Sequence, residues 1–150
     1  MKRKKSERQK LIDKLDKVFS KLIRLRNDYI CEVCGVDYSA TPGMMDCSHY
    51  IGRANTHTRW FSENASAHCK KDHLNFTHRY WEHQTWFRDK IGQGVEDRLF
   101  ERIAEREKMM LKYTVNDLQD MLAHFDEQYS IMKSKRDSGI KGYLNFEDYD

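Results

Sequence analysis

The sequence predicts an α+β fold in which a short, metal-stapled centre containing β-strands is flanked by helices. Apolar residues recur at helical spacing before residue 27 and again after residue 70, whereas residues 29–62 lack that period and contain the only proline. All four cysteines lie between residues 31 and 69. Because only 39% of the residues are hydrophobic and 34% are charged, a small domain of this composition benefits from a staple.

Four helices are predicted, over residues 8–26, 74–91, 95–109 and 115–133. In the first helix the apolar residues alternate four- and three-residue steps through Leu11, Leu15, Val18, Leu22 and Leu25. Gly92 fits the position just after the second helix. Thr114 and Asp117 have the spacing of a capping box that opens the last one.

Two short strands are predicted in the middle of the chain, near residues 29–31 and 44–50. We expect a single domain over residues 11–135, preceded by a basic flexible arm, 1–10, and followed by a loose acidic tail, 136–150. The arm can contact phosphates or simply aid solubility, and the sequence leaves both interpretations open.

The sequence indicates a cytoplasmic protein with no membrane association. No signal peptide is visible, and no apolar run approaches the roughly 18 residues of a membrane span. In a reducing compartment, closely spaced cysteines more often bind a metal than form disulfides.

A metal-binding knuckle is the first functional motif. Cys31 and Cys34 stand at x2 spacing and are followed by Gly35, which permits a tight turn. Thiolates suit zinc, and a structural zinc site needs four ligands. Cys69 is the expected third ligand. For the fourth, Asp72 has the x2 spacing from Cys69, His73 would complete the commoner Cys3His set, and Cys47 is a further candidate.

His49 is the candidate for acid–base chemistry. It follows a predicted strand and lies near Arg53 and Arg59 in the sequence. A neutral imidazole can take a proton from water, and arginines can hold a phosphate through paired hydrogen bonds. Asn64 can brace a loop or orient the histidine, although an ordinary turn role also fits.

The remaining histidines and the aromatic run after residue 75 favour structural roles. We expect the other histidines to be solvated or structural, namely His57, His68, His78, His83 and His124. The aromatic residues of the second helix can stack on bases but are more typical of a core, and they are Tyr80, Trp81, Trp86 and Phe87.

Taken together, these residues resemble the HNH branch of the ββα-metal nucleases, most closely the phage recombination proteins of the NinG/Rap type. The likeness covers roughly residues 12–133 and is most specific in the middle. The motifs that carry it are Phe19-Ser20-x2-Ile23-Arg24-Leu25-Arg26, Asp46-Cys47-Ser48-His49-Tyr50-Ile51-x-Arg53, Thr58-Arg59-Trp60-x3-Asn64 and Cys69.

The resemblance implies a ββα-metal fold stapled by Zn2+, with His49 as the general base and Asn64 bracing the loop between strand and helix. A divalent cation, Mg2+ or Mn2+, would stabilise the charge on the phosphate, and His73 would bind this metal or the phosphate. The DNA contacts expected for such a nuclease are Arg53, Arg59, Lys70 and Lys71.

Two positions depart from the pattern. The second zinc pair is Cys-x2-Asp rather than Cys-x2-Cys, which makes Asp72 the unusual ligand candidate. The residue before the catalytic histidine is often acidic in HNH enzymes, but here it is Ser48. Asp46 lies on the same face of a strand as Ser48 and can substitute as a metal ligand.

The leading hypothesis is a metal-dependent DNA endonuclease that acts in phage recombination or on branched DNA, in the host cell cytoplasm if phage-encoded. The alternative is a non-catalytic, zinc-stapled DNA-binding module. A third hypothesis, a protein-interaction domain with a structural zinc, fits the long charged helices over residues 95–133. The sequence is compatible with a homodimer and does not identify the preferred DNA.

Overall fold

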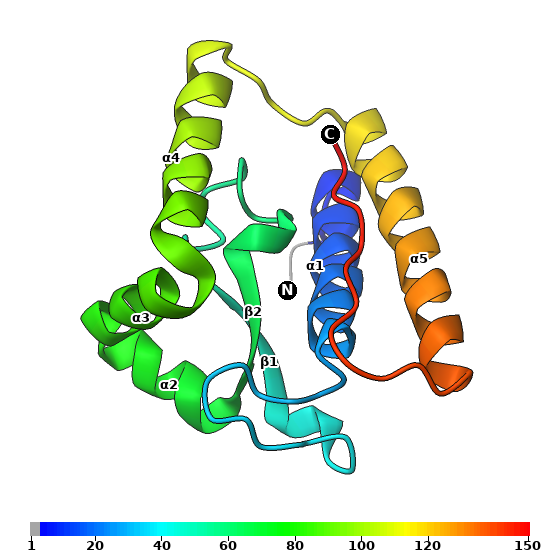
Figure 1. The fold of residues 1–150 in the computed structure, drawn as a ribbon. Coiled ribbons are helices and arrows are strands. Elements are labelled where there is room, and N and C mark those ends of the chain that lie inside the picture. The colour runs from blue at the N-terminus through cyan, green and yellow to red at the C-terminus, as the bar shows by residue number, and fades with distance from the viewer. Residues whose placement is uncertain (1–3) are drawn as a thin grey trace.

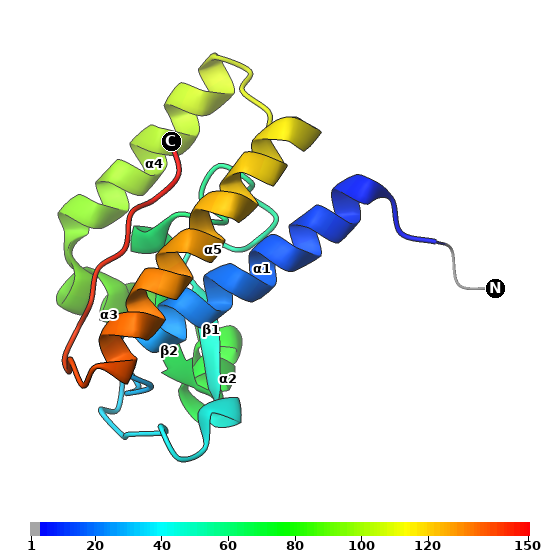
Figure 2. The same cartoon turned by 90° about the vertical axis from the view of Figure 1, so that its right-hand side faces the viewer.

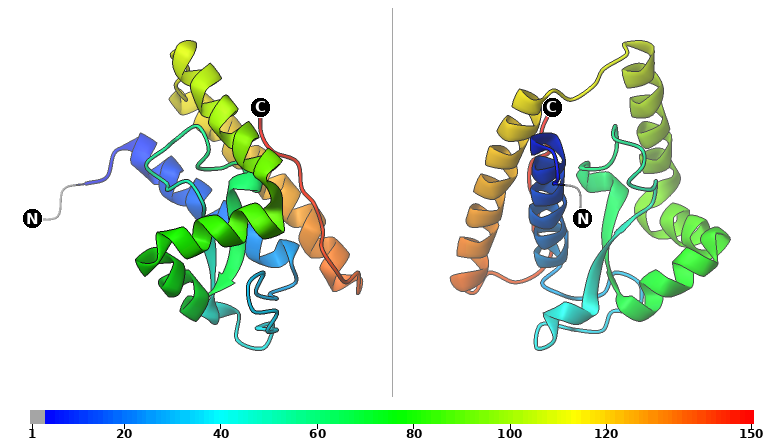
Figure 3. Two further views of the ribbon diagram at one scale, coloured as in Figure 1. Left: turned by 60° about the vertical axis from the view of Figure 1, so that its left-hand side comes forward. Right: turned by 180° about the vertical axis from the view of Figure 1, so that it is seen from behind.

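The computed structural model describes residues 4–150, in which a two-stranded sheet lies between two helical layers (Figure 1). One layer contains α1 (Glu7–Arg26) and α5 (Val115–Asp137), and the other contains the helices between residues 70 and 108. Seen from behind, the sheet lies beside α1, and the second layer covers its opposite side (Figure 3, right). The α+β class predicted from the sequence is confirmed.

The sheet consists of β1 (Met45–His49) and β2 (Ala65–Cys69) in antiparallel pairing. Met45 pairs with Cys69 at one end and His49 pairs with Ala65 at the other. The register therefore places His49 at the end of β1 where the connecting loop begins and Cys69 at the opposite end, next to the following helix. A short 3-10 turn precedes each strand, η1 (Pro42–Met44) and η2 (Ser62–Asn64).

The predicted strand near residues 29–31 is wrong, because this segment forms only one isolated bridge, between Ile30 and Asp37. The chain leaves α1 through Asp28 and Tyr29, whose φ angles of 53° and 59° turn it sharply instead of extending it. The true partner of β1 was missed because Ala-Ser-Ala-His-Cys contains none of the β-branched or aromatic residues typical of strands.

The second helical layer contains four segments where the sequence predicted two helices. The single helix predicted over residues 74–91 begins earlier and is interrupted at Arg79, whose φ and ψ are −125° and 67°. Its early start follows from Cys69, whose side chain accepts a hydrogen bond from the backbone of Asp72 as an N-cap. The segments are α2 (Lys70–His78), α3 (Tyr80–Trp86), a π-helical stretch η3 (Phe87–Gly92) and α4 (Gln93–Lys108).

Helices α1 and α5 pack side by side and run in the same direction. Near their N-termini the Arg8 side chain donates to the Tyr113 carbonyl at 2.7 Å, and near their C-termini Arg136 donates to the Leu25 carbonyl at 2.9 Å. The capping box predicted at Thr114 and Asp117 is present. The apolar face predicted for α1 supplies the centre of the main core.

The C-terminal segment after α5 is packed, although its lack of periodicity predicted a loose tail. It runs back along the pair of α1 and α5 (Figure 2). The Phe146 ring lies 6.1 Å from Phe19 and 6.3 Å from Phe125. Asp148 accepts hydrogen bonds from the backbone and the hydroxyl of Ser62, both at 2.7 Å. The segment therefore ties both helices to the loop before β2.

Part of the predicted basic arm is already helical, because α1 begins at Glu7 with Ser6 as its N-cap. Residues 1–3 lie outside the described residues. Within residues 4–150 we find no helix that combines the length and the apolar composition needed to cross a membrane.

Replacing Phe146 with alanine should lower the free energy of unfolding by about 2 kcal/mol. This is less than the 3–5 kcal/mol typical of a fully buried phenylalanine, because the ring is only partly buried. Urea unfolding measures the change, and Asn145→Ala, on the exposed neighbour, is the matched control. Equal stabilities of the two variants would show that the segment does not pack as described.

Candidate metal centre and histidine cleft

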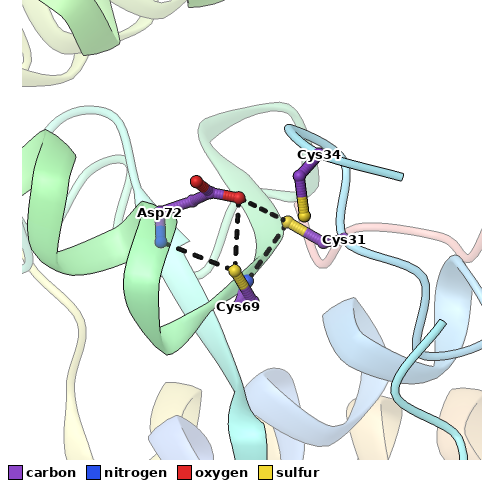
Figure 4. Close-up of side chains that lie close together, drawn as sticks. All are labelled: Cys31, Cys34, Cys69 and Asp72. Carbon is purple, nitrogen blue, oxygen red and sulfur yellow. Dashed lines mark hydrogen bonds between the residues drawn. The ribbon is translucent and has the colours of Figure 1, made fainter. Parts of the chain in front are cut away.

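Three thiols and one carboxylate converge where the loop after α1 meets the start of α2. Cys31 and Cys34 come from that loop, Cys69 ends β2, and Asp72 lies in the first turn of α2. The four side chains point toward one another (Figure 4). One ligand atom from each lies within 4.8 Å of all the others, so this group can hold a metal ion.

The distances in this cluster suit a zinc ion. Asp72 Oδ2 lies 3.3 Å from Cys31 Sγ and 3.2 Å from Cys69 Sγ. In a tetrahedral site, with zinc–sulfur bonds near 2.3 Å and zinc–oxygen bonds near 2.0 Å, sulfur and oxygen ligands are separated by roughly 3.5 Å. Three thiolates and a carboxylate are ligands that zinc accepts.

The backbone around the cluster favours negative charge. The backbone N–H of Cys69 donates to Cys31 Sγ at 3.2 Å, and that of Asp72 donates to Cys69 Sγ at 3.5 Å. Both lie at the N-terminus of α2, where the helix dipole stabilises anions. Gly35 closes the knuckle with a φ of +72°, as its position after Cys34 predicted. Burial raises the pKa of the Cys31 thiol to about 12, so its thiolate form near neutral pH requires a cation.

The structure places Asp72 in the cluster, and it does not place the other two candidates for the fourth ligand there. His73 turns away, with its Nδ1 3.0 Å from Asp46 Oδ2. Cys47 lines the cleft beside His49 on the face of the sheet toward α1. Neighbouring residues on α2 therefore serve two separate sites, because successive positions on a helix point about 100° apart.

His49 is held by a backbone carbonyl. Its Nε2 lies 2.9 Å from the Arg59 carbonyl oxygen, which can only accept, so Nε2 carries the proton and Nδ1 has a free lone pair. The ring stacks at 6.1 Å on Phe19 of α1. Burial lowers the pKa of His49 to about 4, so the ring is neutral near neutral pH.

Asp16 of α1 fixes the part of the loop that holds His49. Its carboxylate accepts from Arg59 Nε at 2.9 Å and from a terminal Arg59 nitrogen at 2.6 Å, and also from Trp60 Nε1 at 2.9 Å. Arg59 was expected to contact DNA, but this paired geometry occupies its guanidinium. Asp16 interrupts the apolar stripe of Ile12, Phe19 and Ile23, a signal that sequence reasoning overlooked.

Asn64 is fully buried and braces the loop between β1 and β2 rather than facing the cleft. Its Oδ1 accepts from the backbone N–H of Ile51 at 2.8 Å, and its Nδ2 donates to the carbonyls of Ile51 at 2.9 Å and Thr58 at 3.1 Å. The loop therefore lies between the two strands, not between strand and helix as the resemblance implied.

An open cleft of about 420 Å³ brings four of the predicted site residues together. They are His49, His73, Asp46 and Arg53. Burial favours a higher pKa for Asp46, but hydrogen bonds from His73 and Lys70 outweigh burial and hold that pKa below its usual value. Lys70 meets Asp46 at 3.0 Å, and Lys71 is exposed. Asn64 and Arg59 do not line the cleft.

Two histidines expected to be solvated or structural are buried behind the sheet. His68 is fully buried, and within the described residues neither ring nitrogen has a hydrogen-bond partner. It packs edge-on against Trp86 at 4.8 Å. Burial lowers the pKa of His68 to about 3 and that of His83 to about 4. In the aromatic run Phe87 is core, whereas Tyr80 and Trp81 are exposed.

Elemental analysis of the purified protein should find one zinc per chain, which Asp72→Ala loses and His73→Ala keeps. The reason is that, of the three candidates for the fourth ligand, Asp72 is the one whose side chain contacts the thiols of Cys31 and Cys69. Cys47→Ser should keep the metal as well, while chelation of the wild type should lower its melting temperature. Zinc lost from His73→Ala but retained by Asp72→Ala would contradict this ligand set.

No protein-family model matches the chain, and no curated protein or solved structure matches it either.

Proposed function

We propose that this protein is a zinc-stapled, metal-dependent endonuclease of the HNH type that hydrolyses phosphodiester bonds in DNA. The observation that carries the proposal is the environment of His49. It is a neutral imidazole with one nitrogen bound to a carbonyl and the other free, at the edge of a cleft that also contains Asp46 and His73. This is the arrangement that a general base for water requires.

The order of the elements supports the proposal. β1 is followed by a braced loop, β2 and α2, which is a ββα unit in the sense that the resemblance implies. His49 ends β1, Asn64 precedes β2 and His73 lies in α2. His49 and His73 thus reach one cleft from distant positions in the sequence, Asn64 braces the loop between the strands, and the Cys3Asp cluster lies at the end of the strands opposite His49.

His49 would take a proton from the attacking water through its free Nδ1. The carbonyl of Arg59 holds the tautomer, and the Asp16–Arg59 pair keeps that carbonyl in place. When the proton arrives, the carbonyl still accepts from Nε2 and stabilises the imidazolium. Arg53, whose side chain is 62% exposed at the cleft and lies 3.8 Å from Asp16 Oδ2, has further guanidinium nitrogens with which it would contact a phosphate oxygen.

Asp46 and His73 are the residues that would hold the catalytic cation. Because a carboxylate accepts from His73 Nδ1, the other nitrogen of this ring offers a lone pair, and the carboxylate offers a second donor group. Bound there, Mg2+ or Mn2+ would supply charge stabilisation for the phosphate and the leaving oxygen. Lys70, paired with Asp46, would have to move aside.

A non-catalytic DNA-binding module is the second candidate. The observation that favours it is Asp46, which is engaged by both Lys70 and His73, as a structural ion-pair cluster would be. Such a module binds DNA with a strong salt dependence but turns over no substrate. Such a module does not need a neutral His49 whose ring is hydrogen-bonded through one nitrogen only.

His49→Ala should abolish DNA nicking in the presence of Mg2+ or Mn2+, because His73, the other imidazole of the cleft, would hold the cation and could not replace the base. Nicking of supercoiled plasmid measures the loss, and zinc content and circular dichroism should match the wild type. His78→Ala, on an exposed histidine of α2, is the control and should retain activity. Undiminished cutting by His49→Ala would contradict the role of His49 as the general base. Absence of cutting by the wild type with either metal would favour the DNA-binding module.

The acid limb of the cleavage rate should lie near pH 4 rather than near the usual histidine value of 6.5. Protonated His49 cannot act as a base, so the rate falls as pH falls through the pKa of the folded protein, which burial has lowered. Single-turnover rates between pH 4 and 8 test this, with zinc content checked at each pH. Half-maximal activity between pH 6 and 7 would contradict it.

A further inference from the structure

A second, smaller pocket opens beside the histidine cleft. Its volume is about 240 Å³, and it shares His49, Gly52 and His73 with that cleft. The rest of its lining is rich in aromatic rings, with Tyr50, Phe76, Tyr80 and His83 beside Ser48 and Thr77. The pocket is smaller than the roughly 300–1,000 Å³ of drug-sized ligand sites, so it suits a single flat ring system.

The fold leaves part of the aromatic wall of this pocket exposed to solvent. The Tyr80 side chain is 55% exposed, although it begins α3 directly beside the pocket. Its ring is nearly parallel to that of Tyr50, with 13° between the planes and 6.5 Å between the centroids. No acidic residue lines the pocket, so nothing in it repels a nucleotide.

His83 supplies polar atoms at the inner wall of the pocket. The residue is 5% exposed, stacks on Phe76 at 4.6 Å and meets Tyr50 edge-on at 5.4 Å. Its ring nitrogens make no hydrogen bond to any residue within 4–150, yet they are not sealed off in the way that those of His68 are. A neutral imidazole offers one donor and one acceptor, as the edge of a nucleobase does.

We propose that this pocket binds one unstacked nucleobase of the strand whose phosphate lies at His49. The inference rests on the proposed function of the neighbouring cleft, because the shared residues place a base in the pocket next to a phosphate in the cleft. Aromatic rings bind bases by stacking whatever the sequence, and the cost of unstacking is smallest where the base is already unpaired. The substrate is therefore DNA with an unpaired base beside the cut.

Binding tests the pocket independently of cutting. Every variant carries the same His49→Ala change, which prevents cleavage and removes one lining side chain equally from all of them, and the probe is a single-stranded oligonucleotide containing the fluorescent base 2-aminopurine. Tyr80→Ala should weaken binding about 5- to 150-fold, the range expected for loss of one base–aromatic stack. Trp81→Ala is the matched control, because Trp81 is 64% exposed on the same helix and does not line the pocket.

Tyr80→Phe keeps the ring and should bind as the parent does, which separates stacking from a folding defect. Quenching of 2-aminopurine should also be lost in Tyr80→Ala only. If Tyr80→Ala and Trp81→Ala bind equally, the pocket does not hold a base. A third outcome is that Tyr80→Ala binds DNA normally but no longer binds a partner protein that the His49→Ala protein binds. The pocket would then hold an aromatic side chain of that partner, and the proposal would be overturned.

Cutting provides the second readout, with the protein carrying the native His49. Abasic sites introduced one at a time along the oligonucleotide should slow cleavage at one position next to the cut, and Tyr80→Ala should remove this difference. Cutting that is indifferent to both changes overturns the pocket while leaving the nuclease intact. Absence of cutting, with Tyr80-dependent binding preserved, overturns the nuclease and leaves the base pocket standing.

Discussion

The convergence of Cys31, Cys34, Cys69 and Asp72 is the constraint on which the rest of the molecule depends. Four groups that become anionic when they bind metal lie within 4.8 Å of one another. Without a cation, burial keeps the Cys31 thiol protonated, and only weak thiol hydrogen bonds to Asp72 hold these groups together. With one, the loop after α1, the end of β2 and the start of α2 are tied together. A two-stranded sheet is too small to be stable alone and needs such a tie.

Positioning of the histidine follows from contacts outside the two strands. Asn64 closes the loop between the strands from inside, and Asp16 holds it from α1 through Arg59. The geometry of His49 thus depends on three segments: the loop that carries Arg59, the η2 turn that carries Asn64, and α1, which carries Asp16. The packing of α1 on α5, together with the returning C-terminal segment, keeps Asp16 in place. Distant parts of the chain therefore contribute to the cleft without lining it.

Residues that are neighbours in the sequence belong to different sites, one to the Cys3Asp cluster and the other to the histidine cleft. Asp72 points to the thiols, whereas His73 points to Asp46 in the cleft. Cys47 and His49 lie on the face of the sheet toward α1, while His68 lies behind it among aromatic rings. The cleft, the Cys3Asp cluster and the aromatic pocket thus lie around one small sheet, and the cleft and the pocket share His49 and His73.

The sequence by itself determined the α+β class, the first and last helices, the capping box at Thr114 and Asp117, and the cysteine knuckle, because periodicity, capping and x2 spacing are local. It also identified His49 and Asn64 as candidates from a motif. It could not determine the partner of β1, because Ala-Ser-Ala-His-Cys acquires strand geometry only by pairing with it. The choice of Asp72 over His73, the capture of Arg59 by Asp16 and the packing of the acidic tail were likewise decided by tertiary structure. Each depends on the direction of a side chain relative to a segment distant in sequence, and no local pattern encodes that direction.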